Sequence, residues 1–140
     1  MLTGAAGSVG RRVGSRLAAA PDVDRVIAID LVEPAELPPG TSFAAADLAT
    51  ADLKPLLEGA DTVVHLAFAA GPDLDDDAVA RANIEGTQRL LDAAGAVGVR
   101  HIVLMSSATV YGAWPANPIP MTEDAPVRPN PGASYPVQKA

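Results

Sequence analysis

Near its start the chain reads Thr3-Gly4-Ala5-Ala6-Gly7-Ser8-Val9-Gly10, in which glycine recurs at a G-x-x-G-x-x-G spacing. The segment lies between an expected strand end at residues 1–3 and an expected helix over residues 8–20. Glycine suits such a turn because phosphate groups can approach a tight backbone that carries no Cβ. The amino end of the helix also offers N–H groups and a partial positive charge. We therefore expect the phosphates of a dinucleotide to bind at Gly4, Gly7, Ser8, Val9 and Gly10.

Acidic residues follow two later strands of the expected fold. Asp30 ends the second strand and lies 20 residues after Gly10. A carboxylate there accepts hydrogen bonds from a ribose diol and repels a 2′-phosphate, so the sequence favours NAD over NADP. An ordinary turn with a solvated Asp30 is the alternative, because a glycine-rich chain produces such spacings by chance. Asp47 and Leu48 follow the third strand and could meet the adenine edge, although capping of the next turn explains Asp47 equally well.

The rest of the chain alternates between apolar runs and helical patterns, which is typical of a parallel sheet with crossover helices. Strands are expected at residues 1–3, 25–30, 41–46, 62–67 and 101–106, and helices at residues 8–20, 53–57, 75–97 and from about 135 onward. The segments at 33–40 and 112–134 are rich in proline and are expected to be loops. The pattern predicts an α/β fold with a doubly wound parallel sheet.

Both ends of the chain indicate a partial domain over residues 1–140. Only three residues precede Gly4, whereas a strand of such a sheet normally has about 5–6 residues. At the other end the chain stops one residue after Lys139, inside an expected helix. We therefore expect the domain to be truncated at both ends.

The composition argues against several classes of protein. A chain of 140 residues is one domain at most, and 49% apolar residues favour a packed core. The net charge of −7 and the scattered basic residues predict no nucleic-acid partner. The lack of cysteine rules out disulfides and thiolate catalysis, and the isolated His65 and His101 predict no metal site. With no apolar run near about 18 residues and no signal peptide, we expect a cytoplasmic protein with no membrane attachment.

Three polar residues in the second half of the chain are candidates for catalysis. Ser107 follows the strand at 101–106, which we expect to be buried, at the edge where parallel sheets bind ligands. Tyr135 and Lys139 are four residues apart and would share one face of a helix. An unperturbed phenol titrates near pH 10, about three units too high for a base at neutral pH, and a nearby ammonium would stabilise the phenolate. Such pairs are common by chance, and Ser107 could simply bond to loose backbone groups.

Taken together, the ordered motifs resemble the cofactor-binding half of an extended short-chain dehydrogenase/reductase, of the NAD-dependent epimerase/dehydratase family. The matching segments run the whole length of the chain: TGAAGSVG at 3–10, Asp30, Asp47-Leu48, VVHLAF at 63–68, NIEGT at 83–87, SSATVYG at 106–112 and YPVQK at 135–139. The resemblance implies a Rossmann-like fold, tightly held NAD and an absent C-terminal substrate domain. It also implies a homodimeric parent protein that acts on a nucleotide sugar or another sugar.

The same resemblance implies roles for single residues. Ser107, Tyr135 and Lys139 would form a catalytic triad, in which Ser107 orients the substrate oxygen and Tyr135 exchanges a proton with a sugar hydroxyl. Tyr135 and Lys139 would also contact the cofactor, Lys139 through the nicotinamide ribose. Asn83 would brace the active site, or would instead bond to neighbouring backbone as an ordinary helix residue. The stretch that passes beside the cofactor would include Leu66, Ala67 and Phe68.

The motifs leave the reaction open. Sugar 4,6-dehydratases resemble one another in carrying Asp-Glu where this chain has Ala108-Thr109, and epimerase-reductases of the fucose-synthase type place a cysteine there. The motif SSATVYG at 106–112 is most similar to that of sugar-nucleotide 4-epimerases. A simple NAD-dependent dehydrogenase and a non-catalytic dinucleotide sensor remain alternatives. Pro136 departs from the small residue usual after the tyrosine, and it disfavours helical geometry at Tyr135. We expect the isolated 140-residue chain to be inactive, because the family's substrate pocket lies largely downstream.

Overall fold

The computed structural model describes residues 1–70 and 76–140. Two compact units divide the chain, Met1–Leu104 and Met105–Ala140, and each is described by itself. The expected helix start at Asp75 lies outside the described residues.

The first unit is built on a five-stranded sheet. Its strands are β1 (Leu2–Thr3), β2 (Val26–Asp30), β3 (Thr41–Ala45), β4 (Thr62–His65) and β5 (His101–Leu104). All pairings are parallel and the order is β3-β2-β1-β4-β5, with Leu2 opposite both Ala28 and Val64. The predicted α/β parallel sheet is therefore confirmed. The strand order reverses between β1 and β4, and such sheets bind ligands at the carboxyl side of that reversal.

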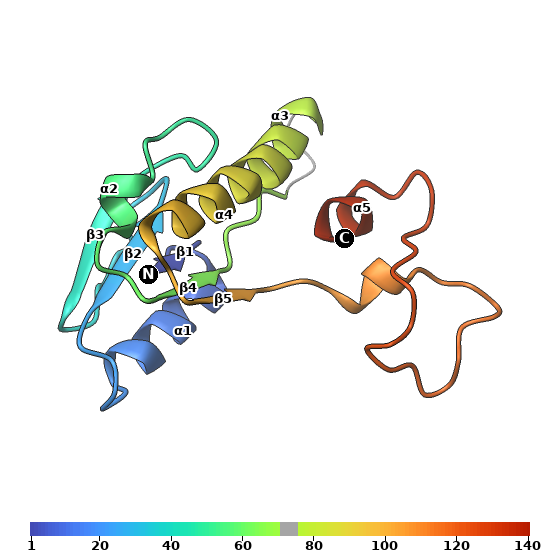
Figure 1. Cartoon of the computed structure of the whole chain (residues 1–140), viewed down its shortest axis with the longest axis horizontal. Helices are drawn as coiled ribbons and strands as arrows, with labels where there is room; N and C mark the ends of the chain where they lie inside the picture. Colours follow the sequence, from blue (N-terminus) through green and yellow to red (C-terminus); the bar gives the residue numbers. More distant parts are fainter. Residues whose placement is uncertain (71–75) are drawn as a thin grey trace. The chain divides into compact units, whose positions relative to one another are not determined.

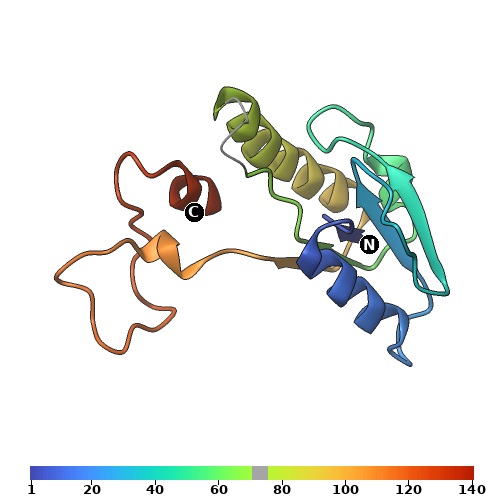
Figure 2. The same cartoon turned by 180° about the vertical axis from the view of Figure 1, so that it is seen from behind.

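Helices cover both faces of this sheet (Figures 1 and 2). Helix α1 (Ser8–Ala18) lies on one face, and α2 (Lys54–Leu57) and α4 (Gly86–Val97) lie on the other. The α4 side packs Ile29, Leu57, Val63 and Leu90 into one fully buried cluster. Burial of each such side chain contributes about 1.5–3 kcal/mol, so this cluster fixes α4 against the strands.

The predicted helix over 75–97 is not regular. Its described part consists of α3 (Asp76–Ala80), a π turn η1 (Arg81–Glu85) and α4. Leu90 is buried, but Ile84 is 52% exposed and Leu91 is 36% exposed. The apolar residues therefore form two stripes, of which only one meets the sheet.

The expectation of a buried fifth strand is wrong. In β5 the side chains of Ile102, Val103 and Leu104 are 42%, 54% and 49% exposed. The strand lies at the edge of the sheet and pairs only with β4 among the described residues. Its apolar run reads like that of a central strand, but a position at the edge leaves it open.

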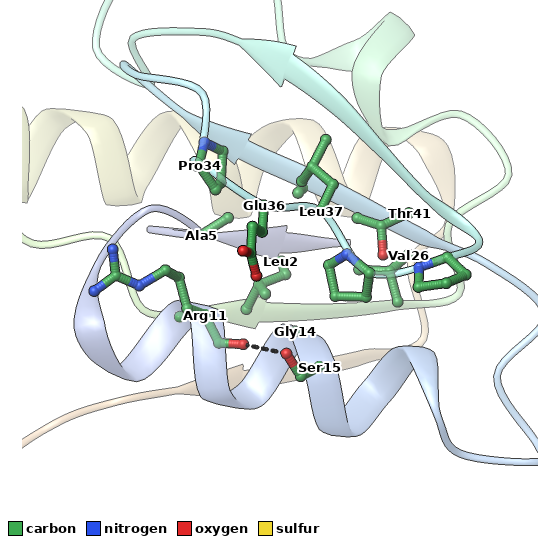
Figure 3. A pocket seen from close by; sticks show the side chains of 14 residues that line it. Leu2, Ala5, Arg11, Gly14, Ser15, Val26, Pro34, Glu36, Leu37 and Thr41 are labelled. Atoms are coloured by element: carbon green, nitrogen blue, oxygen red, sulfur yellow. Dashed lines mark hydrogen bonds between the residues drawn. The ribbon is translucent and has the colours of Figure 1, made fainter.

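The α1 face of the sheet is only partly covered. The connection between β2 and β3, residues 31–40, is fully described and forms a loop instead of a crossover helix. A cavity of about 320 Å³ lies between this loop and α1, over the buried side chains of Leu2, Val26 and Ala28 (Figure 3). Because a loop replaces a helix here, a cavity remains above this part of the core face.

The second unit consists mainly of loops. It contains a 3-10 turn η2 (Ala108–Tyr111) and helix α5 (Ser134–Lys139), so the helix expected near Tyr135 is confirmed. Pro136 lies in the first turn of α5, where proline is tolerated. Across the described residues of both units, the structure contains no helix with the length and apolar character needed to cross a membrane.

Candidate dinucleotide-binding site

Two glycines of the Gly4–Gly10 loop are required by the protein's own packing. Gly4 has a φ of +70°, and a Cβ there would lie 2.6 Å from the backbone nitrogen of Ala67. A Cβ on Gly10 would overlap the carbonyl oxygen of Gly4. The loop is thus folded tightly against the segment after β4 and against the first turn of α1.

Gly7 differs from these two residues. It is the N-cap of α1 and has a φ of −66°, which any residue adopts. A Cβ on Gly7 would lie 3.3 Å from the Gly4 carbonyl oxygen, which is close but far less severe than the contacts at Gly4 and Gly10. No described side chain caps this helix end. The amino end of α1 is therefore open to an anionic ligand, and the absent Cβ leaves room for close approach.

Asp30 connects the glycine loop to the end of β2. Its Oδ2 accepts a hydrogen bond from the backbone N–H of Ala6 at 2.8 Å, and its Oδ1 accepts one from the N–H of Leu31 at 2.7 Å. Two backbone donors thereby hold the carboxylate at the carboxyl edge of the sheet, and its contact with a ribose stays a prediction.

A cavity of about 390 Å³ lies at this edge. Its lining brings together most of the residues predicted to bind the cofactor: Gly4, Gly7, Asp30, Asp47, Leu48, Leu66, Ala67, Phe68 and Asn83. Of the remaining predicted residues, Ser8, Val9 and Gly10 do not line it, and Tyr135 and Lys139 belong to the second unit. The volume is within the range of small-molecule sites, which is about 300–1,000 Å³.

Asn83 holds the segment after β4 in place. It is buried within the π turn, where its amide oxygen accepts from the Ala69 N–H at 2.7 Å and its amide nitrogen donates to the Ala69 oxygen at 2.9 Å. Asn83 thereby braces the cavity wall through the backbone of a residue 14 positions away and not through neighbouring backbone, while its role in an active site stays a prediction. π turns are frequent at functional sites.

A buried polar chain beneath the cavity was not expected from the sequence. Thr3 Oγ1 lies 2.6 Å from His65 Nδ1, and His65 Nε2 lies 2.9 Å from Thr87 Oγ1. These contacts tie β1, β4 and α4 together, and Thr3 and His65 themselves line the cavity. A signal was present, because His65 interrupts the apolar run TVVHLA at a position that parallel strands normally bury.

Asp47 has the capping role that was the alternative in the sequence. Its Oδ1 accepts from the Ala49 N–H at 2.9 Å, which closes the turn after β3. The same residue lines the cavity, so capping and ligand contact are compatible.

The catalytic candidates lie in the second unit. Ser107 caps η2, with its Oγ 2.8 Å from Thr109 Oγ1. Lys139 donates from Nζ to the Met105 oxygen at 2.9 Å, and burial lowers the pKa of its ammonium. Tyr135 lies one helical turn before Lys139 on α5 and is 43% exposed. Within the described residues no group of His, Asp and Glu side chains is arranged to hold a metal ion.

Comparison with known proteins gives the same family over the whole chain. The family model described as "NAD dependent epimerase/dehydratase family" matches residues 1–140. A dTDP-glucose 4,6-dehydratase from Streptomyces griseus is 36% identical over 100% of this chain and 46% of its own length. A UDP-glucose 4-epimerase from Mycolicibacterium smegmatis is also 36% identical, over 96% of this chain and 46% of its own length.

A solved structure agrees with these relatives. A short-chain dehydrogenase/reductase superfamily protein from Agrobacterium tumefaciens, crystallised with bound NAD, matches 99% of this chain and 40% of its own with a TM-score of 0.83 and 35% identity. The chain thus spans less than half the length of these relatives. From the whole-length family match and the glycine loop, we conclude that the chain belongs to the NAD-dependent epimerase/dehydratase family.

Proposed function

We propose that this chain binds NAD in the cavity at the carboxyl edge of the sheet. The observation that carries the proposal is the open amino end of α1 at Gly7, which no described side chain caps and which lies beside the cavity that Gly4, Gly7 and Asp30 line. The N–H groups of Ser8 and Val9, in the first turn of α1 beside the cavity, would hold the pyrophosphate, whereas the Gly7 N–H already donates to the Gly4 oxygen at 3.2 Å. Asp30 would hold the adenosine ribose. Asp47 and Leu48 would meet the adenine, since both line the same cavity.

We further propose that the protein containing this chain moves hydride between a sugar carbinol and NAD. NAD, when bound, would supply the hydride acceptor for the carbon–hydrogen bond that breaks. Tyr135 would take the hydroxyl proton, and Ser107 would donate a hydrogen bond to the substrate oxygen as it becomes a carbonyl. The positive charge of Lys139 would stabilise the phenolate of Tyr135, one turn away on α5.

The substrate class we propose is a nucleotide sugar, because two of the relatives are named for dTDP-glucose and UDP-glucose. Epimerisation is the favoured reaction, since Ala108 and Thr109 offer no further acid or base for the elimination of water. A dehydrogenase that stops after the first hydride transfer needs the same three residues and is the second candidate.

Titration of the 140-residue chain with NAD and NADP tests the binding site. Ligand at one hundred times its dissociation constant should stabilise the folded chain by about 2.7 kcal/mol, with NAD effective at lower concentration than NADP. Gly7→Ala should still unfold cooperatively without ligand, at a slightly lower temperature than the unmodified chain, and should lose most of the NAD response. A folded chain that responds to neither dinucleotide contradicts the proposal.

Turnover of UDP-glucose by the full-length protein tests the reaction. An epimerase yields the 4-epimer without net NADH, a dehydrogenase accumulates NADH, and a non-catalytic sensor does neither. Tyr135→Phe should lower turnover by about 10²–10⁴-fold while NAD still binds. Tyr111→Phe serves as the matched control, and an equal loss in both variants would contradict the role of Tyr135.

A further inference from the structure

The turn after β3 is closed by its own hydrogen bonds. The Asp47 carbonyl oxygen accepts from the N–H groups of Thr50 at 3.1 Å and Ala51 at 2.8 Å. The Asp47 carboxylate accepts from the Ala49 N–H in addition. The direction of the Asp47 side chain therefore depends on how this whole turn is seated.

Helix α4 holds the turn from outside the cavity. Arg89 donates from Nε to the Leu48 oxygen at 3.3 Å and from Nη2 to the Ala51 oxygen at 2.8 Å. One guanidinium thus bonds to the turn at two places, which a lysine cannot do with the same geometry. One turn earlier on the helix, a Cβ on Gly86 would lie only 3.2 Å from Leu48 Cβ, so the turn and the helix are in close contact.

We propose that Arg89 is a positioning residue for the adenine end of the dinucleotide site. It fixes the turn so that Asp47 presents its carboxylate to the exocyclic amino group of the adenine. This inference rests on the proposed NAD site and adds to it a residue that does not line the cavity. Arg89 itself is exposed and touches the ligand site only through the two backbone carbonyls that it holds.

The role of Arg89 in positioning is separable from a role in stability. Leu48 is packed against Gly86 and is 9% exposed, so the turn keeps an apolar contact with α4 when the guanidinium is removed. Removal of an exposed arginine leaves no core cavity. What changes is the freedom of the turn, and hence the distance from the Asp47 carboxylate to the base.

An altered base gives a readout of that distance. Adenine carries a 6-amino group that donates to a carboxylate, whereas hypoxanthine carries a carbonyl oxygen that the carboxylate repels. We expect the chain to bind NAD at least tenfold more tightly than nicotinamide hypoxanthine dinucleotide. Asp47→Ala should remove most of this preference, since it deletes the carboxylate.

The test measures both dissociation constants by calorimetry on the 140-residue chain and its variants. Arg89→Ala should reduce the preference for NAD at least threefold, and Arg89→Lys should recover part of it through one of the two contacts. Gln88→Ala is the matched control, because Gln88 bonds only to Asp92 in the hydrogen bonds described for it and should keep the full preference.

The outcomes separate this inference from the NAD site itself. An Arg89→Ala chain with unchanged preference overturns the inference, and so does an equal loss of affinity for both dinucleotides, which would show a general structural role. Strong NAD binding without any preference in the unmodified chain also overturns it, while the NAD site stands. If neither dinucleotide binds to the folded chain, the proposed function fails and this inference fails with it.

Discussion

The two units of this chain are each stabilised by different internal contacts. In Met1–Leu104 a parallel sheet has helices on both faces and buries large side chains such as Ile29, Leu57 and Leu90 completely. In Met105–Ala140, all of which the structure describes, Val110 is the only buried apolar side chain. Here short hydrogen bonds between loops replace a core, for example from Trp114 Nε1 to the Arg128 oxygen at 2.7 Å.

This difference corresponds to a division of the proposed roles. Candidate cofactor residues of the first unit stand on strand ends and helix turns whose positions the core determines. Candidate catalytic residues stand in a unit whose order depends on a few polar contacts, each worth about 0.5–1.5 kcal/mol. We therefore expect the first unit to resist perturbation and the second to yield locally.

Truncation of the core on the α4 side should have the largest effect. Leu90→Ala should destabilise the first unit by about 2–5 kcal/mol, because Leu90 is 1% exposed and leaves a cavity. Far-UV circular dichroism follows this unit, and the fluorescence of Trp114, the only tryptophan, follows the second. Val110→Ala is the counterpart and should shift mainly the fluorescence transition, so equal shifts of both signals in both variants would refute the division.

The glycine loop gives the next largest contrast, within the first unit. Gly10→Ala should cost about 1–3 kcal/mol or more, because a Cβ would overlap the Gly4 oxygen, which is backbone and cannot turn aside. Gly7→Ala should cost less, about 1 kcal/mol, because Gly7 has an ordinary φ but is an N-cap, where alanine is less favourable than glycine, and its Cβ would lie 3.3 Å from the Gly4 oxygen. Urea denaturation of both variants measures the difference. A large loss in Gly7→Ala would mean that packing, and not a ligand, requires that glycine.

The sequence predicted the first unit well because its signals are local and repeated. Apolar runs marked the strands. The spacing from Gly10 to Asp30 placed the glycine loop and the end of the second strand at the same edge of the sheet. The Thr3–His65–Thr87 chain and the contacts of Arg89 were missed, since both join side chains far apart in sequence. Strand β5 was misjudged because hydrophobicity alone does not distinguish an edge strand from a central one.

For the second unit the sequence predicted less. Proline and glycine marked residues 112–134 as a loop, but composition does not show which side chains hold a loop together. The bond from the Ala113 N–H to Asn130 Oδ1, at 2.7 Å, spans 17 residues without any periodic pattern. The placement of Ser107 against Thr109 is likewise a matter of turn geometry, which residue type alone leaves open.

The hydrogen bond from the Ala113 N–H to Asn130 allows a test of smaller effect in the second unit. Asn130→Ala removes the acceptor of the Ala113 N–H and should loosen the loop by about 0.5–1.5 kcal/mol. Hydrogen exchange at Ala113 and the fluorescence of Trp114 should both report the change, while the circular dichroism transition stays in place. Asn130→Asp keeps an acceptor oxygen and should behave almost like the unmodified chain. If the Ala113 N–H exchanges as fast in Asn130→Asp as in Asn130→Ala, the hydrogen bond to residue 130 does not hold the loop.

The smallest effect is expected at the first unit's ion pair between Arg100 and Asp61, whose side chains are 73% and 66% exposed and 3.8 Å apart. The pKa of Asp61 is lowered chiefly by a hydrogen bond from Thr62 and only secondarily by Arg100. A lowered pKa means that any stabilisation is present at neutral pH and is lost as the pH falls through the pKa of the folded state. Because Thr62 remains, Arg100→Ala should leave the urea midpoint at pH 7 almost unchanged, and urea denaturation at pH 7 and pH 3 measures this. A larger loss at pH 7 that vanishes at pH 3 would show that surface charge, and not the core alone, holds the sheet edge.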